Sequence, residues 1–181
     1  MNYRMLAAAT VISMSALGAA ACSDDDGPGP TPLPTTFVFT TTLLPNNEVP
    51  PVTNADSTAS GAATVTLTVT RDSAGTITSA NTVFAVTVTG FATGTTLTAM
   101  HIHNNVAGQT GNVFVDAALG SGTVALTNGA ASFSRTAPAT TVAQAEAIIA
   151  NPAGHYVNVH TALNPGGAIR GQLTLQSSSQ P

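Results

Sequence analysis

The feature that most constrains the fold is a strict two-residue alternation between residues 64 and 70. This segment reads Thr-Val-Thr-Leu-Thr-Val-Thr, so that every second side chain is apolar. Successive side chains of a β-strand point to opposite faces, and the alternation therefore predicts a strand with one buried and one solvated face. The same period returns at Phe84, Val86 and Val88, after an Asp-Ser-Ala-Gly turn at 72–75 that is typical of a hairpin.

Most of the remaining chain also favours strands. Further strand-like segments lie at 37–44, 95–103, 112–117, 155–161 and 168–175. Asn128-Gly129 predicts a second hairpin, which joins 123–127 to 130–135. We expect an all-β fold, an antiparallel Greek-key β-sandwich or barrel of about eight or nine strands.

One interval has the pattern of a helix instead. Residues 141–150 are rich in helix formers, Thr141 and Gln144 are spaced as a capping box, and Asn151-Pro152 provides a stop. We predict one short inserted helix, whose apolar side packs on the sandwich.

The N-terminus predicts export. A short start with one arginine precedes an apolar stretch at 5–17, and small residues then lead to Cys22, the only cysteine. This resembles a lipoprotein signal of residues 1–21, after which Cys22 is acylated. A plain secretory signal cut near Ala21 is the alternative.

The rest of the chain is predicted to have three parts. We expect residues 22–35 to form an Asp/Pro/Gly-rich linker, residues 36–176 to form the β domain and residues 177–181 to form a disordered tail. The aspartates at 24–26 act as a solvated spacer or as a sorting signal.

The composition excludes several functions. The chain contains no lysine, so it has no Schiff-base lysine, lysine general base or Walker-type phosphate lysine. A single cysteine excludes an intrachain disulfide and a cysteine zinc site. With four arginines against eight carboxylates, we expect no nucleic-acid partner. The carboxylates include no recognisable acid and base pair, and we predict no catalytic residue.

Three histidines are candidate metal ligands. In the strand-like segment 100–103, His101 and His103 share one face, and His160 lies outward on the predicted strand 155–161. Side chains at i and i+2 of a strand, joined by a third from a neighbour, can form a three-histidine site for copper or zinc. The alternative is structural: the imidazoles hydrogen-bond to threonines and main chain on a polar sheet face.

Arg170 needs a partner in a chain with so few charges. Glu48 is the candidate, and we predict that Glu48 and Arg170 form a structural ion pair.

Three motifs together resemble a known family. NNEVPPV, AMHIHNNVAGQTGNVFV and GHYVNVHTALNPGGAIRGQL are similar to the chordin-type (CHRD) domain, in the same order and at similar separations. The resemblance covers roughly residues 37–175 and implies an extracellular β-rich module.

The HIH segment also resembles the copper-ligand strand of copper/zinc superoxide dismutases, which are Greek-key barrels. The chain lacks the dismutase cysteine pair, its zinc cluster and a bridging histidine, so dismutase activity is not expected.

Two functions follow as expectations. The first is a non-enzymatic binding or structural module that is exported and anchored by lipid to a bacterial membrane, at the outer membrane or cell surface. Its expected partner there is an extracellular protein or a surface ligand. The second is a protein with a single copper or zinc ion held by His101, His103 and His160.

Overall fold

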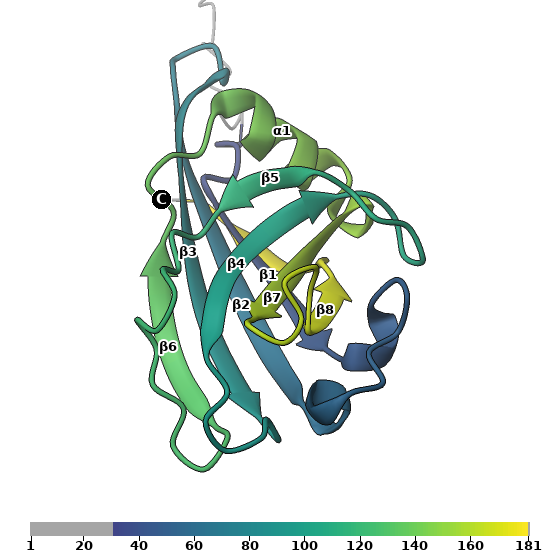
Figure 1. Ribbon diagram of the computed structural model, residues 1–181. Coiled ribbons are helices and arrows are strands. Elements are labelled where there is room, and N and C mark those ends of the chain that lie inside the picture. Colours follow the sequence, from purple (N-terminus) through teal and green to yellow (C-terminus); the bar gives the residue numbers. More distant parts are fainter. Residues whose placement is uncertain (1–30, 181) are drawn as a thin grey trace, which may run out of the picture. The chain divides into compact units, whose positions relative to one another are not determined.

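The computed structural model describes residues 31–180, and these form a two-layer antiparallel β structure (Figure 1). A five-stranded sheet has the order β6-β3-β2-β1-β9, and a four-stranded sheet has the order β5-β4-β7-β8. The strands are β1 (Thr36–Leu43), β2 (Ser60–Arg71), β3 (Ile77–Thr89), β4 (Leu97–Asn104), β5 (Val113–Asp116), β6 (Ala131–Thr136), β7 (His155–Thr161), β8 (Ile169–Gln172) and β9 (Thr174–Ser179). The predicted all-β sandwich is confirmed.

The alternating segment forms the centre of the larger sheet. It lies in β2, which pairs antiparallel with β3 through the predicted turn, where the Asp72 carboxylate accepts hydrogen bonds from the backbone N–H groups of Ala74 and Thr76. Gly75 completes this turn with a φ of 84°, a conformation that favours glycine. The turn residues therefore help to fix the register of the β2–β3 hairpin.

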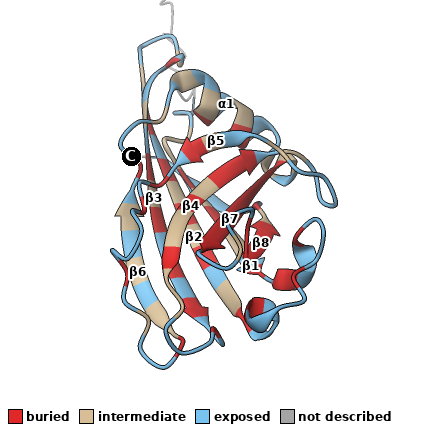
Figure 2. Ribbon diagram, viewed as in Figure 1, coloured by how far each residue is buried: buried red, intermediate tan, exposed pale blue. Residues whose placement is uncertain are grey.

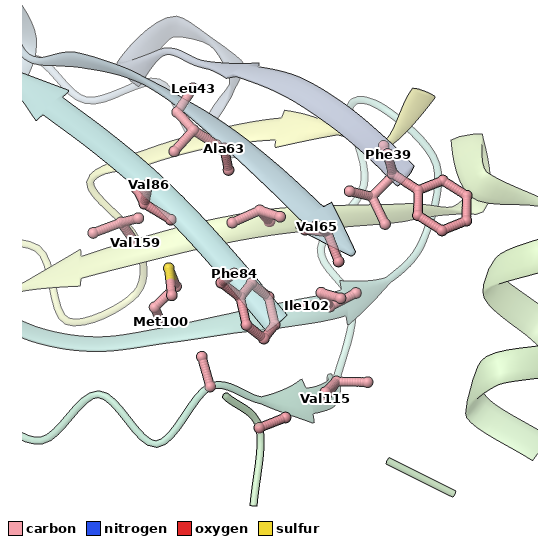
Figure 3. Close-up of a cluster of buried hydrophobic side chains, with 14 of the residues drawn as sticks. Phe39, Leu43, Ala63, Val65, Phe84, Val86, Met100, Ile102, Val115 and Val159 are labelled. Carbon is pink, nitrogen blue, oxygen red and sulfur yellow. The ribbon is translucent and has the colours of Figure 1, made fainter. Parts of the chain in front are cut away.

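The core lies between the two sheets. Apolar residues at alternate positions of β1, β2, β3 and β4 are buried there, and Figure 3 shows Phe84 of β3 beside Met100 and Ile102 of β4. Figure 2 shows the same pattern as buried residues along the strands of both layers. Because Met100 and Ile102 fill the core, their neighbours His101 and His103 lie on the outer face of the smaller sheet.

The predicted helix is confirmed. It is α1 (Val142–Ala150), and Thr141 and Gln144 form the complete capping box at its N-terminus. Ala145 and Ile148 belong to the core cluster, and Val142 and Ile149 pack against it. Within residues 31–180, three short 3-10 helices lie in the connections: η1 (Pro45–Asn47), η2 (Ala55–Thr58) and η3 (Pro152–Gly154).

Two strand predictions were wrong in part. Asn128 and Gly129 do form a turn, both with positive φ, but residues 123–127 contribute only an isolated bridge between Thr127 and Ala130, and β6 pairs with β3 instead. The predicted strand 168–175 is two strands in different sheets, β8 and β9. Leu173 lies between them with its side chain in the core, so the chain crosses from one layer to the other there.

Both predicted ends of the β domain need correction. Ser177–Ser179, predicted as part of a disordered tail, lie in β9 and pair with β1. At the other end, the predicted linker extends to residue 35, but the Pro34 carbonyl accepts a hydrogen bond from Arg71 and the Thr35 carbonyl accepts one from the Val69 N–H. These hydrogen bonds make Pro34 and Thr35, the last linker residues, part of the folded unit.

The predicted signal sequence and Cys22 lie outside the described residues. Over 31–180, the structure has no helix with both the length and the apolar character of a membrane span.

Candidate metal centre

The predicted histidine pair and its neighbour converge on the outer face of the smaller sheet. His101 pairs across the ladder with Asn158, and His160, two residues further along β7, lies opposite Ala99. The small Ala99 side chain leaves room beside His101, where His160 lies. The structure thus brings together all three histidines that the sequence singled out.

The three rings face one another closely. His101 Nδ1 lies 3.1 Å from His160 Nε2, and the ring centroids of His101 and His103 are 5.5 Å apart. One ring nitrogen of each histidine lies within 4.8 Å of the others. Nitrogen ligands of a tetrahedral ion with bonds of about 2.0–2.1 Å are about 3.3 Å apart, so binding requires a movement of about 1.5 Å at most.

The second ring nitrogen of each histidine faces an oxygen atom that can accept a hydrogen bond. His103 Nδ1 donates to the Gly111 carbonyl and His160 Nδ1 to the Pro165 carbonyl, each at 3.0 Å, because a carbonyl oxygen can only accept. His101 Nε2 lies 3.7 Å from the Asp116 carboxylate. These contacts place the proton of His103 and of His160 on Nδ1 and leave Nε2 of each unprotonated.

Burial keeps the cluster neutral. It lowers the pKa of all three histidines below the usual value of 6.5, and that of His160 reaches about 4. The Pro165 carbonyl opposes this shift at His160, and the charged forms of His101 and His103 reinforce it. Neutral imidazole is the form that binds a metal ion, so at neutral pH the ligands do not have to lose a proton first.

An aromatic stack supports one side of the cluster. The Tyr156 ring lies parallel to the His103 ring, at 5.1 Å between centroids and an angle of 7°. The Arg170 guanidinium lies over Tyr156, 4.0 Å from the ring centroid. The Tyr156 hydroxyl accepts a hydrogen bond from the Gly111 N–H, so the same tyrosine also holds the loop whose carbonyl binds His103.

Loops cover this polar face, which an open sandwich would leave in water. Every residue of β7 is buried, on both faces of the sheet. Arg170 donates to the Gln109 carbonyl and Gln172 to the Asn105 carbonyl, both in the loop 104–112. The Asn47 side chain reaches the Arg170 carbonyl from η1. The histidines therefore lie in a largely enclosed polar layer.

Glu48 and Arg170 are both buried and line one cavity of about 520 Å³, between η1, the loop 104–112 and β8. The charge of Arg170 lowers the pKa of Glu48, but desolvation is the larger effect and raises it to about 7. Arg170 donates to the Gln109 carbonyl and stacks on Tyr156 instead of forming an ion pair with Glu48 within 4.0 Å. The two charges influence each other, while their predicted direct contact is replaced by these other partners.

Sequence reasoning missed the residues that orient the histidines. Asp116 becomes a neighbour of His101 only through the register of β5 against β4. Gly111 is required because a Cβ there would collide with the Asn104 carbonyl oxygen, and this contact depends on the loop conformation. The fourth histidine, His155, lies apart from the cluster: it donates to the Asn151 carbonyl and packs against Phe114.

The comparisons with known proteins agree with the fold and with the motifs. Residues 39–173 match the CHRD domain, a range that runs from β1 to the end of β8 and includes the whole histidine cluster. No curated protein and no solved structure matches the chain. The match covers most of the sequence, and the chain belongs to the CHRD domain family.

Proposed function

We propose that this CHRD-domain protein is a non-enzymatic module of the cell envelope that binds one copper or zinc ion through His101, His103 and His160. The observation that carries the proposal is the convergence of three imidazole nitrogens within 4.8 Å, each on a ring whose other nitrogen faces a carbonyl or carboxylate oxygen. Histidine ligands of metal ions usually have such a partner on the second nitrogen.

The hydrogen bonding of His101 supports a bound cation. His160 Nε2 is an acceptor, so His101 Nδ1 must carry the proton if the two nitrogens are to bond at 3.1 Å. Neutral His101 then turns the bare lone pair of Nε2 toward the Asp116 carboxylate. In the opposite tautomer, His101 Nε2 carries the proton and points it toward Asp116. The lone pairs of His101 Nδ1 and His160 Nε2 then face each other. A metal ion between the two histidines satisfies all of these groups.

A second observation that supports a bound metal ion is a buried histidine nitrogen without a partner. His103 Nε2 is buried and has no hydrogen-bond partner among the described residues. Leaving a buried acceptor unpaired costs about 1–3 kcal/mol, and a metal–nitrogen bond would remove that cost. Three neutral imidazoles with no carboxylate or thiolate ligand suit copper or zinc better than magnesium or calcium, which prefer oxygen ligands.

Elemental analysis tests this function directly. An untagged soluble chain beginning at Ser23 would be compared with the double variant His101→Ala, His103→Ala and with His155→Gln as the control histidine outside the cluster. We expect about one equivalent of copper or zinc in the wild type and in the control, and none in the double variant. A folded wild type that takes up neither metal after reconstitution would leave the histidines with a structural role.

A further inference from the structure

A buried carboxylate from a distant part of the chain binds the residues next to His160 and Pro165. Asp56 lies in η2, far from the histidines in sequence, and its exposed fraction is 0%. Its Oδ2 accepts hydrogen bonds from the Thr161 hydroxyl at 2.7 Å and from the Asn164 side-chain amide at 2.6 Å. Burying a carboxylate is costly, and both of its strong hydrogen bonds go to the turn between β7 and β8.

The two donors lie on either side of the His160 interaction. Thr161 directly follows His160, and Asn164 directly precedes Pro165, whose carbonyl accepts from His160 Nδ1. Thr161 and Asn164 are also joined to each other, because the Asn164 N–H donates to the Thr161 hydroxyl oxygen at 3.0 Å. One carboxylate oxygen therefore holds both the ring-bearing strand and the carbonyl that orients the ring.

A second residue of the same segment strengthens this connection. Asn54 and Asn164 exchange two side-chain hydrogen bonds, at 2.7 and 3.1 Å. Asn54 also caps η2 by accepting from the Asp56 N–H, which fixes the position of the Asp56 backbone. The turn at 161–167 is thus attached by four side-chain hydrogen bonds to one short helix and its N-cap, which contribute no ligand themselves.

We propose that Asp56 is a positioning residue for the metal centre: it holds the Pro165 carbonyl in place and thereby keeps the proton of His160 on Nδ1 and the lone pair of Nε2 toward His101 and His103. This inference rests on the proposed function and extends it to a residue outside the ligand set. Groups that accept directly from a ligand histidine typically change metal affinity by about 10–100-fold when they are removed, and Asp56 acts on such a group, the Pro165 carbonyl, through the neighbouring Asn164.

Three aspartate variants of the soluble chain test the proposal. Asp56→Ala removes both hydrogen bonds, while Asp56→Asn retains an oxygen that can accept from both donors in place of Oδ2. Asp72→Ala is the matched control, because Asp72 also accepts two hydrogen bonds on one oxygen, in the β2–β3 turn away from the histidines. We expect the dissociation constant for copper or zinc to rise about 10–100-fold in Asp56→Ala only, and to be restored in Asp56→Asn.

The tautomer of His160 provides a readout that does not require metal. In nitrogen-15 NMR spectra of the metal-free protein, wild type, Asp56→Asn and Asp72→Ala should show His160 protonated at Nδ1, and Asp56→Ala should show a mixture of tautomers. If Asp56→Ala is folded and keeps both the wild-type tautomer and the wild-type affinity, Asp56 is only structural and the proposal is overturned.

Two further outcomes are separable. If Asp56→Ala does not fold, Thr161→Val removes one donor and should raise the dissociation constant, whereas Thr161→Ser keeps the hydroxyl and the affinity; equal affinity of these two variants would overturn the proposal. If the wild type binds no metal, the proposed function fails, and the NMR comparison alone then supports or rejects Asp56 as the residue that positions His160.

Discussion

Glu48 is a buried carboxyl whose ionisation opposes folding. Desolvation raises its pKa from 4.5 to about 7, although Arg170 and a hydrogen bond from Asn158 act in the opposite direction. Between these two values the folded protein binds more protons than the unfolded chain, so this group lowers stability as the pH rises from about 4.5 to 7. Glu48→Gln removes the titration, and we expect the variant to gain up to about 3 kcal/mol relative to wild type between pH 5 and pH 8.

Denaturant unfolding of the metal-free proteins at the two pH values measures this difference. Glu146→Gln makes the same chemical change at an exposed position of α1 and should show no comparable gain. The lowered pKa of His160 changes the stability in the opposite direction, because the folded protein loses stability as the pH falls from 6.5 toward 4. This effect is common to all three proteins. If the difference in unfolding free energy between Glu48→Gln and wild type were the same at both pH values, Glu48 would not be a buried carboxyl with a raised pKa.

The three candidate ligand histidines could be predicted from the sequence, but the residues that orient their rings could not. His101 and His103 share a face because a strand alternates, and the valines of β7 identify the outward side of His160 in the same way. Asp116, Gly111 and Pro165 orient the rings through register and loop conformation, which depend on contacts between segments far apart along the chain. Local pattern contains no information on such contacts.

The same division applies to the elements. The capped helix and most strands were predicted within a residue or two, because their signals are local, but β2 begins at Ser60, four residues before the alternating segment 64–70. The split of 168–175 was missed, since its apolar pattern continues through Leu173 while the chain changes sheets. At Gly171 the Thr42 backbone lies where a side chain would begin, so β1 and β8 approach closely at this crossing. The crossing depends on the packing of two sheets, and the sequence of one segment does not reveal it.

The last strand provides a test at the scale of elements. Ser177, Ser178 and Ser179 pair with Val38, Phe37 and Thr36 of β1, and the Thr35 N–H donates to the Ser179 carbonyl. Deleting residues 177–181 removes these pairings, and at about 0.5–1.5 kcal/mol for each hydrogen bond we expect a loss of roughly 1–3 kcal/mol. Deleting residue 181 alone is the control. Thermal or denaturant unfolding measures the loss, and unchanged stability would show that the end of β9 contributes nothing.

For the molecule as a whole, the loops over the smaller sheet matter most. A sandwich usually leaves its outer faces in water, but here loops from three parts of the chain bury one of them and enclose its histidines. Enclosure lowers the histidine pKa values. The metal centre that we propose is therefore a property of the assembled domain, and it would be lost on unfolding.

We propose that Cys22, which lies outside the described residues, attaches this domain to a membrane. If Cys22 is acylated, stable attachment requires at least two lipid chains, and residues up to the start of the domain act as a tether. Cys22→Ala leaves the apolar export segment intact and removes the attachment point. We expect the full-length variant to move from the membrane fraction to the soluble periplasmic or secreted fraction, as measured by fractionation and immunoblotting.

Ser23→Ala is the control for this experiment, because it changes a neighbouring residue and keeps the thiol. It should remain with the membrane, and metabolic labelling with a fatty acid should mark wild type and Ser23→Ala but not Cys22→Ala. Cys22→Ala that partitions like the wild type would eliminate lipid attachment through this residue and favour a plain secretory signal cut near Ala21. The histidine cluster would be unaffected by that result, because the folded unit that contains it begins after the tether.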